Sequence, residues 1–211
     1  MYKNRDLEKG LKRSENMRDK RTLEMTSLAM FIAIVVVMAM IPHVGFFQYG
    51  GGIAVTTLHI PVIIGTLYGG VKFGASLGIA FGVFSMIIAF LRPDSGNVIF
   101  QAPHIAIIPR LIFGLATWYL FVGLTRLIRD FRVRVGVTFA LATLLHTVVT
   151  LAFIVIFQAS LREMYGEFIT LLMAAFPLNG LLEMGLAIVI GTPIAVRLMR
   201  SREYSLHEYQ E

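Results

Sequence analysis

The fold is decided by residues 56–82, TTLHIPVIIGTLYGGVKFGASLGIAFG. This stretch is apolar apart from one Gly-Gly-Val-Lys turn, one histidine and a few hydroxyl groups. Gly74, Gly78 and Gly82 recur every four residues, so they share one face of a predicted helix, where a neighbouring backbone can approach closely in lipid. The pattern predicts two membrane helices joined by a tight turn, with the glycines used for internal helix packing.

Composition places the whole chain in the membrane class. Of its 211 residues, 56% are hydrophobic and only 15% are charged, and the mean hydropathy is +0.74. These apolar residues form long runs, which is typical of integral membrane proteins. The absence of cysteine excludes disulfides, thiolate metal sites and cysteine nucleophiles. The formal charge of +6 comes from basic residues at the ends of apolar runs, so it indicates topology and not nucleic-acid binding.

The apolar runs predict an all-α integral membrane protein with six transmembrane helices. These helices are expected at residues 27–41, 53–67, 73–91, 102–125, 135–158 and 168–197. Residues 1–23 form a polar basic leader, 24–200 the membrane domain and 201–211 a tail. The first apolar run begins too late for a cleavable signal peptide, so we expect the leader to stay on the mature protein.

The distribution of Lys and Arg predicts the orientation. With the amino terminus inside, the inner segments carry 16 of the 19 basic residues, the outer loops carry two, and Arg110 lies within a span. Cytoplasmic segments of membrane proteins are enriched in Lys and Arg. We therefore expect both termini in the cytoplasm and the loops 43–52, 92–101 and 159–167 outside.

Four runs of sequence carry a family resemblance: TTLHIPVIIG, GGVKFGASLGIAFG, IIPRLIFG and NGLLE. Together they resemble the substrate-binding S-component of energy-coupling-factor (ECF) vitamin transporters, over about residues 28–200. The resemblance implies a six-helix subunit of the prokaryotic plasma membrane that captures a vitamin at the outer face. It also implies delivery through a transmembrane coupling subunit driven by two cytoplasmic ATPases, with no enzymatic activity or cofactor of its own. The sequence agrees, because it contains no Gly-rich phosphate loop with Lys and Ser/Thr.

The vitamin is predicted from the type of S-component. The apolar first loop, TTLHIPVIIG and the Pro109–Arg110 pair most resemble pantothenate-type members, and riboflavin-type members are the nearest alternative. Pantothenate is a small carboxylate with hydroxyls and an amide, which suits neutral donors and one cation. Riboflavin would need more stacking aromatic residues than the loops offer.

Two other classes of function are open to a chain of this kind. An intramembrane enzyme would need a serine with a histidine, or paired aspartates, inside the spans, but Asp94 and Asp130 lie in loops and Ser85 has no base at a helical interval. A channel would need a repeated carbonyl filter or a ring of charges, and neither is found in the sequence.

The candidate substrate-binding residues are mostly neutral hydrogen-bonding groups near the outer halves of the spans. They are Gln48, Tyr49, Thr57, His59, Asn97, Gln101 and Asn179, together with the cation Arg110. Candidate apolar walls are Phe46, Phe47, Phe100 and Trp118. His59, His104 and His146 are too scattered for a metal-site spacing, so we expect no metal. A lone membrane histidine can equally serve as a hydrogen-bonding element between helices.

Arg110 needs a partner, because a guanidinium in mid-membrane costs a few kcal/mol on insertion scales. Glu183 is the acidic residue that lies well inside another span, four residues after Asn179. We predict an Arg110–Glu183 ion pair that clamps the fourth and sixth helices, with donors of the arginine left for an anionic substrate.

Ala29 and Ala33 form a small-xxx-small pair in the first span. The resemblance implies that this pair docks the coupling subunit, whereas a small pair is also common in any packed membrane helix.

The loop 43–52 contains four glycines, which lie on both sides of Phe46, Phe47 and Tyr49. This composition favours a lid that closes over a bound vitamin, with Gln48 or Tyr49 donating to it, and the alternative is a flexible connector.

Overall fold

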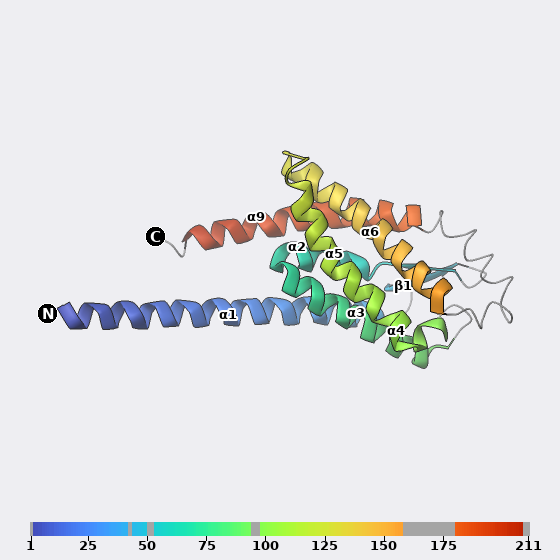
Figure 1. Cartoon of the computed structure of the whole chain (residues 1–211), viewed down its shortest axis with the longest axis horizontal. Coiled ribbons are helices and arrows are strands. Elements are labelled where there is room, and N and C mark those ends of the chain that lie inside the picture. Colours follow the sequence, from blue (N-terminus) through green and yellow to red (C-terminus); the bar gives the residue numbers. More distant parts are fainter. Residues whose placement is uncertain (1, 42–43, 50–52, 94–97, 158–179, 209–211) are drawn as a thin grey trace.

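The computed structural model describes residues 2–41, 44–49, 53–93, 98–157 and 180–208. Its elements form a helix bundle with a β-hairpin at one end (Figure 1). The helices are α1 (Tyr2–Met40), α2 (His59–Gly69), α3 (Val71–Leu91), α4 (Pro103–Ala106), α5 (Ile108–Leu124), α6 (Phe131–Phe157) and α9 (Thr192–Glu208). The short elements are the strands β1 (Phe46–Tyr49) and β2 (Ile53–Thr56), the 3-10 turn η1 (Val98–Gln101) and the π-helical turn η2 (Ala187–Gly191).

Among the described residues, five helical segments are long and apolar enough to cross a membrane. They are Arg18–Met40, Val71–Leu91, Pro103–Leu124, Phe131–Phe157 and Gly180–Ser201. The remaining helix, α2, has 11 residues and is about 16 Å long, shorter than the ~30 Å hydrocarbon core of a bilayer. The predicted class of helical membrane protein is thus confirmed. Both termini lie at the same end of the bundle (Figure 1), and the side of the membrane they face stays a prediction.

The predicted second span, 53–67, is wrong in its first part. Ile53–Thr56 forms the strand β2, which pairs antiparallel with β1 so that Phe46 lies opposite Thr56 and Tyr49 opposite Ile53. The segment is rich in β-branched residues, which favour strands, and the helix begins only at His59. The predicted lid, 43–52, therefore contains a strand, while residues 43 and 50–52 lie outside the described residues. Residues 168–179 of the predicted sixth span also lie outside them.

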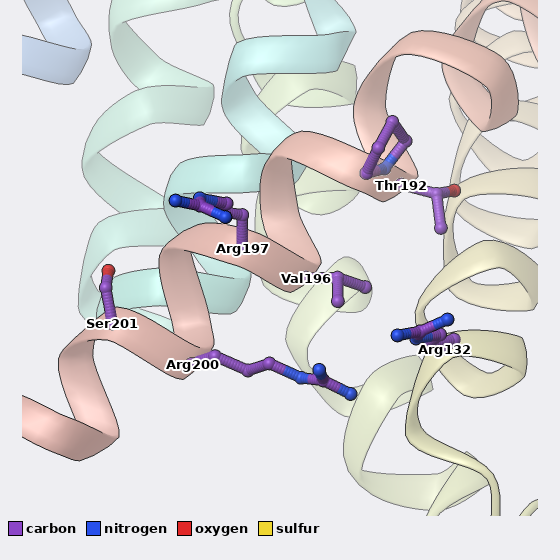
Figure 2. A pocket seen from close by; sticks show the side chains of 7 residues that line it. Arg132, Thr192, Val196, Arg197, Arg200 and Ser201 are labelled. Carbon is purple, nitrogen blue, oxygen red and sulfur yellow. The ribbon is translucent and has the colours of Figure 1, made fainter.

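The predicted leader and the first part of the predicted tail are helical, and they extend α1 and α9 beyond the membrane spans. α1 is unbroken from Tyr2 to Met40, although its membrane part begins only at Arg18. α9 extends beyond Ser201, where the last span ends, and it lies next to the start of α6 (Figure 2). The π-helical turn η2 directly precedes α9, close to Pro193, which lacks the backbone donor that regular helical bonding requires.

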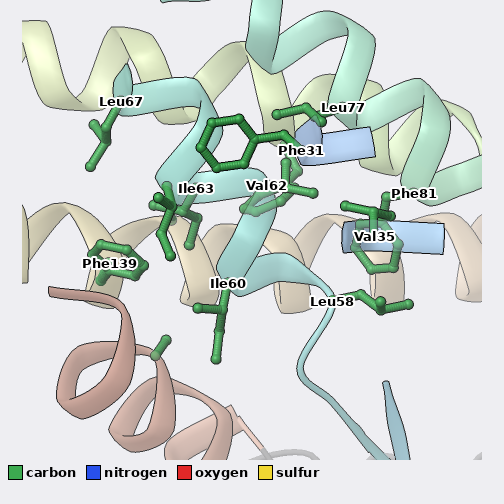
Figure 3. Close-up of a cluster of buried hydrophobic side chains, with 14 of the residues drawn as sticks. Phe31, Val35, Leu58, Ile60, Val62, Ile63, Leu67, Leu77, Phe81 and Phe139 are labelled. Atoms are coloured by element: carbon green, nitrogen blue, oxygen red, sulfur yellow. The ribbon is translucent and has the colours of Figure 1, made fainter. Parts of the chain in front are cut away.

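α2 lies at the centre of the bundle. All its residues from His59 to Leu67 are buried, and it packs against α1, α3, α5, α6 and α9. In Figure 3 its apolar side chains lie among those of the neighbouring helices, namely Phe31 and Val35 of α1, Leu77 and Phe81 of α3, and Phe139 of α6. The stretch singled out in the sequence is therefore the core of the structure.

The glycine ladder packs α3 against α5, as predicted. A Cβ atom at Gly74 would overlap the backbone carbonyl of Gly114, and one at Gly78 would overlap that of Arg110. Close backbone contact of this kind requires residues without side chains. The turn from α2 into α3 is made at Gly70, whose φ of 84° favours glycine.

Candidate ligand-binding site

Four buried titratable side chains gather near the hairpin end of the bundle, and we call them the polar cluster. They are His59 on α2, Arg110 on α5, His146 on α6 and Glu183 on the helix that precedes η2. None is more than 4% exposed, and each lies within electrostatic reach of at least one other member. Four different helices therefore bring ionisable groups together inside an otherwise apolar bundle.

The two histidines face each other within a frame of aromatic rings. Their rings are nearly parallel, with centroids 6.0 Å apart and an interplanar angle of 18°. Phe113 and Phe81 lie 4.9 Å and 5.4 Å from His146. The backbones of Thr56 and Glu183 are close to the His59 ring, but neither ring nitrogen makes a well-formed hydrogen bond to a residue that the structure describes. The imidazoles are thus positioned by packing, with hydrogen-bonding capacity to spare.

Arg110 is held by one backbone carbonyl and two rings. Its Nη1 donates to the carbonyl oxygen of Ile105 over 2.8 Å. The guanidinium carbon lies 4.5 Å from the centroid of Phe100 and 5.5 Å from that of Phe81, distances typical of cation–π contacts. The Nε donor has no partner among the described residues. The Nε–H is thus a donor that an anion could use.

Glu183 connects the last helix to the base of the hairpin. Its Oε1 accepts a hydrogen bond from the backbone amide of Thr56 over 2.6 Å, and the hydroxyl of Thr147, which donates to the carbonyl oxygen of Thr143, lies nearby. Arg110 and Glu183 are close enough to attract each other. The hydrogen bonds shown for the two groups go to other partners, so the ion pair between them stays a prediction.

Several buried polar atoms in and around the cluster have no hydrogen-bond partner in the described part of the chain. They are both ring nitrogens of His59, Nδ1 of His146, Nε of Arg110, Oγ of Ser85 and Oγ1 of Thr143. Buried polar groups are nearly always paired, and each unpaired one costs about 1–3 kcal/mol. Their concentration at one place is the chemistry expected of a site for a polar ligand.

The structure brings His59 and Arg110, two of the predicted substrate-binding residues, into one cluster. Thr57 is buried nearby, but its hydroxyl donates to the backbone carbonyl of Val44. Gln101 donates to the carbonyl oxygen of Ala89 over 3.0 Å. Both side chains are thus held by hydrogen bonds to the backbone. Their contact with a ligand stays a prediction.

The other candidates are distributed differently. Gln48 and Tyr49 lie in β1, opposite Ala54 and Ile53 of β2. Asn97 and Asn179 lie outside the described residues. Trp118, a predicted wall, is eight residues beyond Arg110 on α5, or about 12 Å along the helix, and its ring lies 6.2 Å from that of Phe121.

His146 is the member of the cluster that the sequence left ambiguous. It stands on α6 with Thr143, Thr147 and Thr150 at intervals of three and four residues, so these polar groups share one face of the helix. A polar face on an apolar membrane helix is turned toward the protein interior. That spacing is the signal that could have selected His146 over His104, which is exposed.

The predicted docking residues Ala29 and Ala33 are both exposed on α1. Met30 and Val37 are exposed on the same helix, by 53% and 55%. This surface of α1 is thus open in the described part of the fold, as a helix-docking surface needs to be. Whether a coupling subunit binds there stays a prediction.

An apolar helix bundle with a buried polar cluster at one end is the architecture of a membrane protein, and such a cluster is typical of a site for a small polar molecule. The chain belongs to the family described as ECF transporter, substrate-specific component, whose model matches residues 23–195. This match confirms the family resemblance of the sequence. The protein is therefore a multi-pass membrane protein of the prokaryotic cell membrane.

Two curated relatives share the chain's sequence over different lengths. The pantothenic acid transporter PanT of Lactococcus lactis subsp. cremoris is 27% identical over 203 residues, which cover 90% of this chain and 100% of the relative. The pantothenate transporter PanT of Leuconostoc mesenteroides subsp. mesenteroides is 30% identical over 103 residues, or 47% of this chain and 50% of the relative.

Proposed function

We propose that this chain is the substrate-specific subunit of an ECF transporter that imports pantothenate. Two relatives named as pantothenate transporters support the substrate, and one of them is similar over its whole length. The family membership supports a role in transport. The vitamin is captured at the outer face and passed on through a coupling subunit driven by two ATPases.

The observation that carries the substrate proposal is the chemistry of the polar cluster. Arg110 is the buried cation among the described residues, and its Nε–H, which has no partner among them, can donate to the single carboxylate of pantothenate. His59 and His146 offer unpaired ring nitrogens for hydroxyl and amide groups. A riboflavin ring would instead need open aromatic faces, whereas Phe81 and Phe100 already pack against Arg110.

The position of the cluster supports capture from outside. Figure 1 has the hairpin at the end of the bundle opposite to the two termini, and β2 ends at Thr56, which donates to Glu183. The charge distribution of the sequence predicts cytoplasmic termini, so this end faces out. A ligand would then enter beside the hairpin. The hairpin, which includes part of the predicted lid 43–52, would close over the bound ligand.

A thermal-shift panel of vitamins on the purified full-length chain tests the substrate. At a concentration 100 times the Kd, a ligand stabilises the folded state by about 2.7 kcal/mol. For a chain of this length this corresponds to a rise in Tm of roughly 5–11 °C. We expect that rise with pantothenate and none with riboflavin. A rise with riboflavin alone would overturn the substrate, and no rise with any vitamin would favour a different class of protein.

Co-purification tests the transport assembly. Expressed with the coupling subunit and two ATPases of the same cell, the tagged chain should retain all three in detergent. Loss of all three from the Ala29→Trp and Ala33→Trp variants would support docking through the exposed face of α1.

We also propose that Arg110 and Glu183 act as a clamp between α5 and the last helix. Arg110→Ala and Glu183→Ala should each lower Tm, and the double variant should lose less than the sum of the two. Additive losses would mean that the two charges do not stabilise each other.

A further inference from the structure

A second charged site lies at the opposite end of the bundle from the polar cluster. A pocket of about 680 Å³ is formed there between α6 and α9 (Figure 2). Three arginines line it, Arg132 at the start of α6 and Arg197 and Arg200 on α9. The rest of the lining is Thr192, Pro193, Val196 and Ser201, with no acidic side chain. We call this the arginine pocket.

Arg132 and Arg200 come from different helices and face one another across the pocket. In Figure 2 the side chain of Arg200 extends toward Arg132, Val196 lies between α9 and α6, and Arg197 extends in another direction. Guanidinium groups that line one pocket repel one another unless an anion lies among them. Guanidinium also matches phosphate in shape, because its planar fork can donate two parallel hydrogen bonds.

The pocket lies at the level where two membrane spans end. The last span ends at Ser201, and the span of α6 begins at Phe131, next to Arg132. Arginines at this level reach the headgroups of the bilayer. Below them the lining becomes apolar at Pro193 and Val196.

The apolar surface continues from the pocket toward the middle of the membrane. Val189, Ile190 and Ile194 are 72%, 45% and 48% exposed on the same helical segment. A basic pocket next to an exposed apolar helix surface matches the two parts of a phospholipid, namely its anionic headgroup and its acyl chains. Free phosphate would use only the upper part, and a cytoplasmic protein would not reach the lower part.

We propose that the arginine pocket binds the phosphate of an anionic phospholipid whose acyl chains lie along the exposed apolar surface of the last helix. Basic pockets between transmembrane helices are known to hold anionic headgroups. The site is separate from the polar cluster and does not depend on the substrate. The bound lipid would join the ends of α6 and α9, which meet through this pocket.

Native mass spectrometry of the full-length chain in detergent tests the proposal directly. The protein is titrated with phosphatidylglycerol, with phosphatidylcholine of the same acyl chains, and with inorganic phosphate. We expect phosphatidylglycerol to be retained in preference to phosphatidylcholine, and inorganic phosphate neither to bind nor to displace it. The double variant Arg132→Gln/Arg200→Gln should reduce the affinity for phosphatidylglycerol about 30-fold, given the usual contribution of each basic residue near an anionic surface.

The matched control removes the same charge outside the pocket. Arg126 and Arg129 are exposed in the segment before α6 and do not line the pocket. Arg126→Gln/Arg129→Gln should therefore retain phosphatidylglycerol as the parent does. If the Arg132→Gln/Arg200→Gln protein does not fold, the single variant Arg132→Gln, which leaves α9 unchanged, should weaken binding about 5-fold.

Three results would overturn the proposal. Equal retention of both lipids would show that charge is not recognised. An equal loss in both double variants would show a general electrostatic effect without a site. Binding of inorganic phosphate at the affinity of the lipid would assign the pocket to a soluble anion.

Discussion

Replacing Arg110 by glutamine tests whether the buried guanidinium binds the carboxylate of the substrate. The residue is 3% exposed, its Nη1 donates to the carbonyl oxygen of Ile105, and its Nε has no partner in the described part of the chain. A hydrogen bond to a charged group contributes about 1.5–3 kcal/mol. Arg110→Gln should therefore weaken pantothenate binding roughly 10- to 150-fold. Pantothenol, the alcohol analogue without a carboxylate, should bind variant and parent to within about 3-fold.

Isothermal titration calorimetry measures the affinity of the parent and of the Arg110→Gln protein for pantothenate and for pantothenol. The four affinities form a double-mutant cycle, which gives the coupling free energy between the Arg110 side chain and the carboxylate of the ligand. Arg134→Gln is the matched control. The Arg134 guanidinium also packs on two rings, 5.1 Å from Phe121 and 5.5 Å from Phe131, but it lies at the start of α6, away from the polar cluster. This variant loses similar cation–π contacts and should bind both ligands as the parent does.

An equal loss of affinity for pantothenate and pantothenol would refute the reasoning. It would mean that Arg110 supports the shape of the cluster, through Phe81, Phe100 and Ile105, without touching the carboxylate. Unchanged affinity for pantothenate would exclude Arg110 from the site altogether. Melting curves of both variants distinguish these results from loss of folded protein.

Three further predictions concern packing, docking and the hairpin. Gly114→Leu should lower Tm by roughly 2–12 °C, because its side chain would overlap the facing α3 backbone, whereas Gly123→Leu, with open space around it, should not. Ala29→Trp and Ala33→Trp should abolish uptake by cells without changing substrate binding, and normal uptake would contradict docking there. Glu183→Ala should speed amide hydrogen exchange in β2, because the Glu183 carboxylate accepts a hydrogen bond from the amide of Thr56, the last residue of that strand. Equal exchange in variant and parent would show that this bond does not hold the hairpin.

The sequence predicted those parts of the fold that depend on composition and spacing. Long apolar runs predicted the membrane helices, because a lipid-facing surface needs many consecutive apolar residues. The four-residue spacing of Gly74, Gly78 and Gly82 predicted close helix packing, and the structure shows the partner backbone to be that of α5. The identity of this partner helix could not be predicted, because the spacing of glycines along one helix does not indicate which helix packs against it.

The hairpin was missed because hydropathy does not distinguish a short strand from the first turn of an apolar helix. Ile53–Thr56 reads as the beginning of a span, and only its pairing with β1 makes it a strand. Strand formation of this kind depends on contact with a second segment. The length of α2 was overestimated for the same reason.

The polar cluster was predicted only in part, because it is a property of four helices together. Arg110 and Glu183 stand out in the sequence, since charges are rare inside spans. His59, His104 and His146 look alike along the chain, yet the structure buries the first and the last and exposes the second. Burial of a single histidine depends on helix rotation, which an apolar span does not specify.

The short central helix explains how a membrane bundle can hold a polar ligand at all. Because α2 begins at His59, its positive amino-terminal end lies inside the bundle, at the polar cluster, and not at the membrane surface. Helix amino termini favour negative charge, and discontinuous helices in transporters use this end toward anionic substrates. Arg110 adds a full positive charge at the same place, and Glu183 is occupied by the hairpin amide. The helix terminus and Arg110 thus favour a carboxylate at this place, whereas a charged Glu183 opposes one.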